Sequence, residues 1–168
     1  ILDRPRHAEL IREVREAGAR IKLITDGDVA GAISTALPDT GVDLLMGVGG
    51  APEAVITAAA MKCLGGELQT KLSGRNEEDE ARADEAGLGD FGRVYPSEEP
   101  EPGAILLFAA TGITDGDMLQ GVRFYGPKAT TESIVMRMLT GTVRRIRTTH
   151  DLSRKTLRSF RAGQEMSL

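Results

Sequence analysis

Apolar and polar residues are arranged in short blocks along the first part of the chain, and these blocks predict strands and helices in alternation. Apolar runs bounded by glycine, proline or charged residues predict three strands, at residues 20–25, 42–48 and 67–72. Helical spacing of apolar residues predicts three helices, at residues 5–17, 29–37 and 52–64. Proline near a helix start and glycine after its end support these bounds, as at Pro5 and Gly18. Such alternation with short loops is typical of a layered α/β domain.

The second part of the chain has a different pattern. An acidic segment at residues 76–87 predicts a solvated helix, and a loop rich in proline and glutamate follows at 96–102. Short β-rich runs then predict strands at residues 104–110, 122–125, 133–138 and 143–148. Thr140-Gly141 lies between the last two runs, as a hairpin turn would. We therefore expect an α/β fold over residues 1–150, with a layered mixed sheet, flanking helices and a β-rich C-terminal part, followed by a basic tail at 151–168.

Composition narrows the class of protein. The 168 residues are 40% hydrophobic and carry a net charge of −4, which favours a globular domain and argues against a nucleic-acid binder. Cys63 is the only cysteine, which excludes an intramolecular disulfide and a zinc cluster of thiolates. No apolar run approaches the roughly 18 residues of a membrane span. The chain begins at Ile1 without a signal-peptide pattern, so we expect a cytoplasmic protein and a segment of a longer chain.

Two acidic turns directly follow the first two predicted strands. Asp26-Gly27-Asp28 follows one strand, and Gly49-Gly50 with Glu53 follows the other. Because ligands of open α/β sheets collect at the carboxyl ends of strands, both turns are candidates for one binding crevice. For the two aspartates the alternative is capping of the next helix, although capping needs only one carboxylate. The same alternatives are open for a third turn of this kind at residues 114–117.

Glu53 lies one residue after Pro52, in the first turn of a predicted helix. A carboxylate there can simply interact with the helix dipole. The preceding glycine pair allows the backbone to approach a ligand, so a site for an oxyanion and a metal ion is the second interpretation. The glycines do not form a dinucleotide fingerprint, because proline occupies the position of the third glycine.

Basic residues occur at both ends of the chain. Arg4 and Arg6 flank Pro5 at a helix start, where cations are unfavourable unless an anion is bound nearby. His7 is expected at the surface or as a cap, and His150 at a strand end without a partner. No spacing supports a catalytic triad. The basic C-terminal segment from Arg144 to Arg161 predicts solvated strand faces or a subunit contact.

Several motifs in this order resemble the class II fructose-1,6-bisphosphatases. They are Asp3-Arg4-Pro5-Arg6-His7, Ile24-Thr25-Asp26-Gly27-Asp28, Gly47-Val48-Gly49-Gly50-Ala51-Pro52-Glu53, Met61-Lys62-Cys63-Leu64-Gly65-Gly66, Ala110-Thr111-Gly112-Ile113-Thr114-Asp115-Gly116-Asp117, and the hairpin of residues 133–146. The resemblance covers about residues 1–150 and corresponds to the second half of such an enzyme. It implies a member of the lithium-sensitive sugar-phosphatase superfamily that removes the 1-phosphate of fructose 1,6-bisphosphate in gluconeogenesis.

The resemblance also implies roles for individual residues. The residues implied to bind substrate are Arg4, Pro5, Arg6, Asp26, Gly27, Asp28 and Gly50. Glu53 is implied to bind Mn²⁺ or Mg²⁺. The remaining metal carboxylates of the family belong to the other half, so we expect little activity from this chain alone and a homo-oligomer at full length. The alternative is a non-catalytic α/β module that binds a sugar phosphate or a nucleotide.

Overall fold

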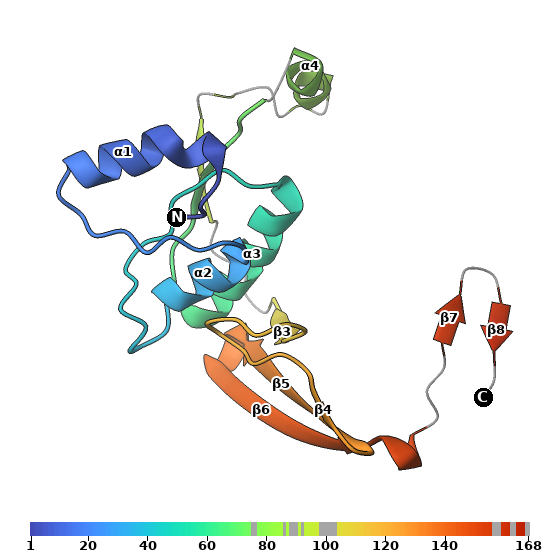
Figure 1. The fold of residues 1–168 in the computed structure, drawn as a ribbon. Coiled ribbons are helices and arrows are strands. Elements are labelled where there is room, and N and C mark those ends of the chain that lie inside the picture. The colour runs from blue at the N-terminus through green and yellow to red at the C-terminus, as the bar shows by residue number, and fades with distance from the viewer. Residues whose placement is uncertain are drawn as a thin grey trace. The chain divides into compact units, whose positions relative to one another are not determined.

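The computed structural model describes residues 1–74, 77–85, 87, 91, 93–97, 104–155, 159–161 and 164–166. It confirms a mixed α/β fold with antiparallel sheets and flanking helices (Figure 1). Contacts divide the chain into two compact units. The first is Ile1–Leu107 with Met136–Thr142, and the second is Phe108–Val135 with Val143–Leu168. None of the helices in the described residues is both long and apolar enough to cross a membrane.

The helices of the first unit follow the sequence pattern closely. A 3₁₀ turn, η1 (Pro5–His7), leads into α1 (Ala8–Glu16), and α2 (Asp28–Thr35), α3 (Ala51–Leu64) and α4 (Glu77–Glu85) follow. Gly65 ends α3 in the left-handed conformation, with φ of 71° and its N–H donating to the carbonyl of Met61. Because such a cap strongly favours glycine, the predicted helix end is confirmed there.

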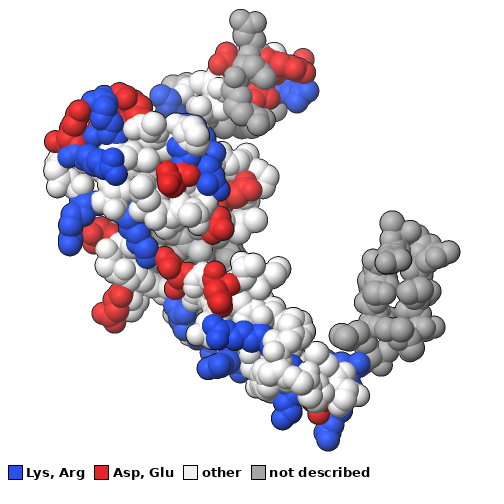
Figure 2. Space-filling model, in the orientation of Figure 1, with Lys and Arg blue, Asp and Glu red and all other residues white. Residues whose placement is uncertain are grey.

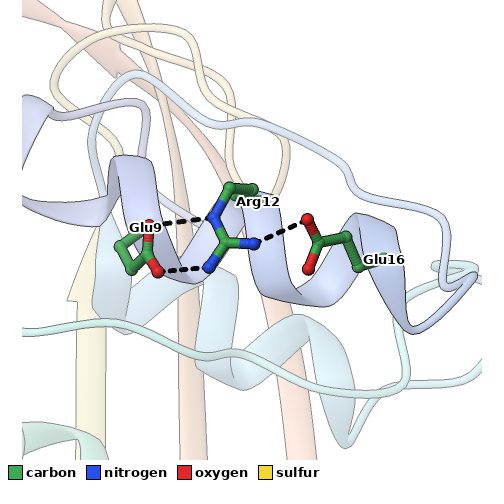
Figure 3. Close-up of polar contacts among 3 residues, drawn as sticks. All are labelled: Glu9, Arg12 and Glu16. Carbon is green, nitrogen blue, oxygen red and sulfur yellow. Dashed lines mark hydrogen bonds and ion pairs between the residues drawn. The ribbon is translucent and has the colours of Figure 1, made fainter.

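Ion pairs stabilise the exposed face of α1. Arg12 donates to the carboxylates of Glu9 and Glu16, three residues before it and four after it (Figure 3). Hydrogen bonding to Arg12 lowers the pKa of Glu9, and the two carboxylates raise the pKa of Arg12. These ion pairs stabilise the helix locally. Ile11 is the buried residue of α1.

The predicted strands at 20–25 and 42–48 are not formed. The only pairing there among the described residues is a parallel bridge between Leu2 and Ile24, where Asp3 N–H donates to the Ile24 carbonyl at 2.8 Å. A strand needs a neighbour that continues the ladder, and the described residues do not supply one for these segments. Leu44 and Val48 consequently remain 67% and 51% exposed.

One side of these two segments still packs on α2. A Cβ built on Gly31 would lie 2.9 Å from Ile24 Cδ1 and 3.2 Å from Leu45 Cδ1, so both side chains meet at this glycine. Helix α2 packs in turn against α3. Ile33 and Ala60 are fully buried at the centre of the helical core. The core therefore holds both segments beside α2 without a sheet ladder.

The remaining strands of the first unit form a short ribbon. β1 (Gln69–Lys71) confirms the prediction at 67–72, and it pairs antiparallel with β2 (Val94–Pro96). No strand was predicted at β2, because its three residues carry too little pattern. Part of the predicted loop at 96–102, from residue 98 onward, lies outside the described residues, as do residues 76 and 86 of the predicted acidic helix.

The second unit is dominated by a four-stranded sheet. Its strands are β3 (Leu107–Thr111), β4 (Arg123–Tyr125), β5 (Lys128–Arg137) and β6 (Thr142–Asp151), in the order β3-β5-β4, with β6 paired to β5. The turn between β5 and β6 is grouped with the first unit and contains η2 (Met138–Thr140) and Gly141 at φ of 56°, so the predicted hairpin is confirmed. Phe108, Ala129 and Ile134 are buried in this sheet.

Short elements complete the C-terminal segment. η3 (Leu152–Arg154) follows β6, and β7 (Ser159–Arg161) pairs antiparallel with β8 (Gln164–Met166). The sequence pattern did not predict this last pairing, because neither strand shows a clear alternation of apolar and polar residues.

Candidate functional site

The first acidic turn lies at the start of α2. Gly27 precedes the helix in the left-handed conformation, with φ of 74° and ψ of 51°. Asp28 is the first helical residue, and its Oδ1 accepts a hydrogen bond from Val29 N–H at 2.9 Å. Gly27 is the N-cap, and α2 has no side-chain cap hydrogen bond, so the aspartates do not cap this helix. Asp26 is exposed beside it.

The other oxygen of Asp28 faces the glycine turn. A Cβ built on Gly49 would lie 2.9 Å from Asp28 Oδ2, and a Cβ on Gly50 would clash with Glu53 Oε2. A side chain at either glycine would therefore make the neighbouring carboxylate shift. Gly50 directly precedes α3, and Glu53 folds back over it from the first helical turn. The second acidic turn and the first one meet at this point.

The arginine turn, residues 4–7, contacts the glycine turn, residues 47–50. Arg6 Nε donates to the Val48 carbonyl at 2.9 Å, across 42 residues of sequence. The terminal nitrogens of Arg6 make no hydrogen bond within the described part of the chain. Arg4 donates from Nη1 to the Asp3 carbonyl at 3.1 Å, and both arginines are exposed. The Arg6 guanidinium is thus held beside the glycine turn with its terminal nitrogens left for an anion, while Arg4 bonds to the backbone of its neighbour Asp3.

His7 corrects the expectation of a surface position. It is only 1% exposed, and its ring is hydrogen bonded on both sides. Nδ1 lies 2.9 Å from the Leu2 carbonyl oxygen, and Nε2 accepts from Val48 N–H at 2.8 Å. No local signal predicts this burial, because both partners of the ring are backbone groups of other segments.

The predicted site residues carry charges of both signs. Asp26, Asp28 and Glu53 contribute carboxylates, and Arg4 and Arg6 contribute cations. In the view of Figure 2, acidic and basic side chains are interspersed over α1, without a large patch of one sign there. Within the described residues, no group of three or more histidine, cysteine, aspartate or glutamate side chains could hold a metal ion.

The third acidic turn belongs to the second unit and has a structural contact. Asp115 Oδ1 accepts from Gly121 N–H at 2.9 Å and lies 3.5 Å from Arg123 Nη2. The Gly121 hydrogen bond, followed by the charge of Arg123, lowers the pKa of Asp115. Val122 N–H donates to the Ile113 carbonyl in the same loop, so the carboxylate helps to close it.

The basic segment is also tied to neighbouring groups. His150 accepts or donates at Nε2 with Thr131 Oγ1 at 2.9 Å, and Nδ1 lies 2.6 Å from Lys155 Nζ. The expectation that His150 lacks a partner is therefore wrong. Arg145 donates to the Met118 carbonyl at 2.9 Å. Arg144 and Arg147 are exposed, as expected for solvated strand faces.

Comparison with known proteins identifies the family of this chain. A family model described as "Bacterial fructose-1,6-bisphosphatase, glpX-encoded" matches residues 1–150. A "D-fructose 1,6-bisphosphatase class 2/sedoheptulose 1,7-bisphosphatase" of Synechococcus sp. (strain JA-3-3Ab) is 47% identical over 162 residues, covering 89% of this chain and 47% of the relative. A protein of the same name from Microcystis aeruginosa (strain NIES-843 / IAM M-2473) is 48% identical over the same length and coverage. The chain thus spans about half the length of the curated relatives it matches.

Proposed function

The chain belongs to the family of glpX-encoded bacterial fructose-1,6-bisphosphatases, and on that basis we propose that it forms the substrate-binding wall of a metal-dependent sugar-bisphosphatase. The reaction is hydrolysis of the 1-phosphate of fructose 1,6-bisphosphate. The observation that carries the proposal is the meeting of three separate sequence motifs at the glycine turn. Arg6 bonds to Val48, Asp28 touches Gly49, and Glu53 folds over Gly50.

The arginines suit the phosphate that does not react. Guanidinium groups bind phosphate through two parallel hydrogen bonds, and the Nε contact of Arg6 with Val48 sets the orientation of its terminal nitrogens. Arg4 lies two residues away on the other side of Pro5, whose ring restricts the backbone between them. A phosphate held here orients the sugar through remote binding energy, which lowers the entropic part of the barrier.

The acidic and glycine turns suit the sugar. Asp26 and Asp28 provide carboxylate oxygens that accept hydrogen bonds from hydroxyl groups, and the left-handed Gly27 joins them in one tight turn. Gly50 precedes the first turn of α3, where free N–H groups favour an oxyanion. These are the roles that the family resemblance implies for the same residues.

Glu53 fits one position of a Mn²⁺ or Mg²⁺ site. It is an exposed carboxylate at a helix start, and hard cations prefer such oxygen ligands. A bound cation in such an enzyme neutralises phosphate oxygens and lowers the pKa of the attacking water. Because the described residues contain no cluster of three such ligands, further ligands must come from elsewhere in the functional protein. Glu53 itself would orient the cation relative to the glycine turn.

The experiment combines turnover and binding. Phosphate release from fructose 1,6-bisphosphate and from sedoheptulose 1,7-bisphosphate is measured with and without Mn²⁺, and binding of both is measured by calorimetry. We expect measurable binding but little turnover by these 168 residues, since a single carboxylate ligand does not build a multi-metal site. Robust Mn²⁺-dependent release would contradict the expected inactivity, and absence of binding would contradict the assigned substrate wall.

A non-catalytic sugar-phosphate module is the second candidate. The contact of Arg6 with the glycine turn favours it, because anion binding needs the arginines and the glycine turn alone. Titration of Glu53→Gln with and without Mn²⁺ separates the candidates. Binding that is independent of the metal and unchanged by the substitution supports the module. Loss of a Mn²⁺-dependent increase in affinity supports the phosphatase.

Assembly and location remain predictions. A homo-oligomer is expected from the resemblance, and light scattering after size-exclusion chromatography measures it directly. Cell fractionation tests the expected cytoplasmic location.

A further inference from the structure

The backbone of Val48 is held at both its polar groups by two consecutive residues, Arg6 and His7. Its carbonyl accepts from Arg6 Nε at 2.9 Å, and its N–H donates to His7 Nε2 at 2.8 Å. Val48 directly precedes the two glycines of the candidate site. The two bonds together therefore determine how the glycine turn lies relative to the arginines.

The partners of His7 require one state of its ring. A backbone N–H can only donate, so Nε2 must carry a free lone pair toward Val48. A carbonyl oxygen can only accept, so Nδ1 must carry the proton toward Leu2 at 2.9 Å. Only the neutral ring with its proton on Nδ1 satisfies both contacts. The ring thus links the N-terminal strand segment, the arginine turn and the glycine turn.

Packing makes the ring hard to replace. His7 is 1% exposed, and a Cβ built on Gly47 would lie 3.4 Å from both Cε1 and Nε2 of the ring. The flat imidazole therefore lies against the backbone of Gly47 while it bonds to the next residue. An aliphatic side chain in this place would remove the buried bond to the Leu2 carbonyl and the partly buried bond from Val48 N–H.

We propose that His7 is a positioning residue that fixes the glycine turn relative to Arg6, and thereby sets the spacing between the phosphate-binding and the sugar-binding parts of the site. This inference rests on the proposed function. His7 does not touch substrate in it. Its effect passes through the backbone of Val48, since the Val48 carbonyl shares a planar peptide group with the N–H of Gly49.

Two amide substitutions divide the functions of the ring. Asparagine places its amide about as far from the backbone as Nδ1, so His7→Asn keeps a donor for Leu2 and loses the acceptor for Val48. Glutamine reaches about as far as Nε2, so His7→Gln keeps the acceptor for Val48 and loses the donor for Leu2. Each variant loses one hydrogen bond, which is buried for Leu2 and partly buried for Val48, and the thermal midpoint should fall in both.

The first readout needs no ligand. In nitrogen-detected NMR of the unsubstituted chain, the His7 ring should show a protonated Nδ1 and an unprotonated Nε2. The Val48 amide should exchange slowly with solvent in the unsubstituted chain and in His7→Gln, and at least tenfold faster in His7→Asn. A proton on Nε2, or equal exchange in the two variants, would overturn the link.

The second readout is affinity for fructose 1,6-bisphosphate by calorimetry. We expect His7→Gln to bind within about threefold of the unsubstituted chain and His7→Asn to bind about tenfold more weakly, the effect of one hydrogen bond. Equal affinities of the two variants at equal stability would overturn the positioning role. If the unsubstituted chain binds no bisphosphate, the proposed function fails, and the NMR readout still decides whether the Val48 link exists.

Discussion

Replacing Arg6 by lysine tests whether the guanidinium has two simultaneous tasks. Its Nε bonds to the Val48 carbonyl at 2.9 Å, while its terminal nitrogens lie free for an anion among the described residues. Lysine keeps the positive charge but has a single nitrogen. Its three N–H donors share that one nitrogen, so it cannot keep the Val48 bond and also present the planar fork of a guanidinium to the phosphate.

The magnitudes follow from the exposure of the residue. Arg6 is exposed, so loss of the Val48 bond should lower the free energy of unfolding by no more than about 1 kcal/mol. Loss of the forked contact with phosphate should cost about 1.4 kcal/mol, which is about a tenfold weaker affinity. Arg6→Gln removes the charge as well and should weaken binding further, by about a hundredfold in total.

The assay is calorimetric titration with fructose 1,6-bisphosphate, accompanied by urea unfolding of each variant. Arg12→Lys is the matched control, because Arg12 is an exposed arginine that bonds only to carboxylates of its own helix in Figure 3. It makes the same chemical change outside the site and should leave affinity unchanged. If Arg6→Lys binds as tightly as the unsubstituted chain, or if Arg12→Lys weakens binding equally, the assignment of Arg6 to phosphate is wrong.

Three further predictions concern the glycine turn, the loop of the second unit and the core. Gly49→Ala places a Cβ 2.9 Å from Asp28 Oδ2, so the carboxylate must shift. The affinity for the bisphosphate, measured by calorimetry, should fall several-fold with little change in stability. Unchanged affinity would argue against the contact. The pKa of Asp115 is lowered by the N–H of Gly121, so the ionised carboxylate stabilises the fold above its unfolded pKa. The unsubstituted chain should therefore be more stable than Asp115→Asn at pH 6, a difference that closes as the pH falls from about 4 through the lowered pKa in urea unfolding; a constant difference at all pH values would contradict this. Ile33 is fully buried, so Ile33→Ala should lower the free energy of unfolding by about 2–5 kcal/mol in the same assay. A change below about 1 kcal/mol would show that the surrounding core collapses around the smaller side chain.

Helices were predictable because their signals are local. Pro5, Gly18, Pro52 and Gly65 mark helix ends, and the helices begin or stop within a few residues of each. Hydrogen bonds of a helix join residues four apart, so one short segment contains the whole pattern. The hairpin of β5 and β6 was predictable for the same reason, because its strands are joined directly through Gly141.

The prediction of strands at 20–25 and 42–48 was wrong, because an apolar run indicates only that a segment can be buried. Whether it forms a ladder depends on a neighbour, and only Leu2 pairs with Ile24 in the described residues. The pairing of β1 with β2, in contrast, exists but was not predicted. Its partners lie 25 residues apart, between Thr70 and Tyr95 for example, and no short window contains both.

The sequence by itself determined the helices, the family resemblance and the chemistry available at Arg6, Asp28 and Glu53, since residue type sets charge, hydrogen-bonding capacity and local propensity. Only the tertiary structure decided which of these groups meet. The contact of Arg6 with Val48 spans 42 residues, and the burial of His7 depends on backbone groups at both Leu2 and Val48. Such contacts form when the core brings distant segments together, and no single segment encodes them. For that reason the glycine turn could be recognised from its residues, whereas the histidine that holds it in place could be found only in the fold.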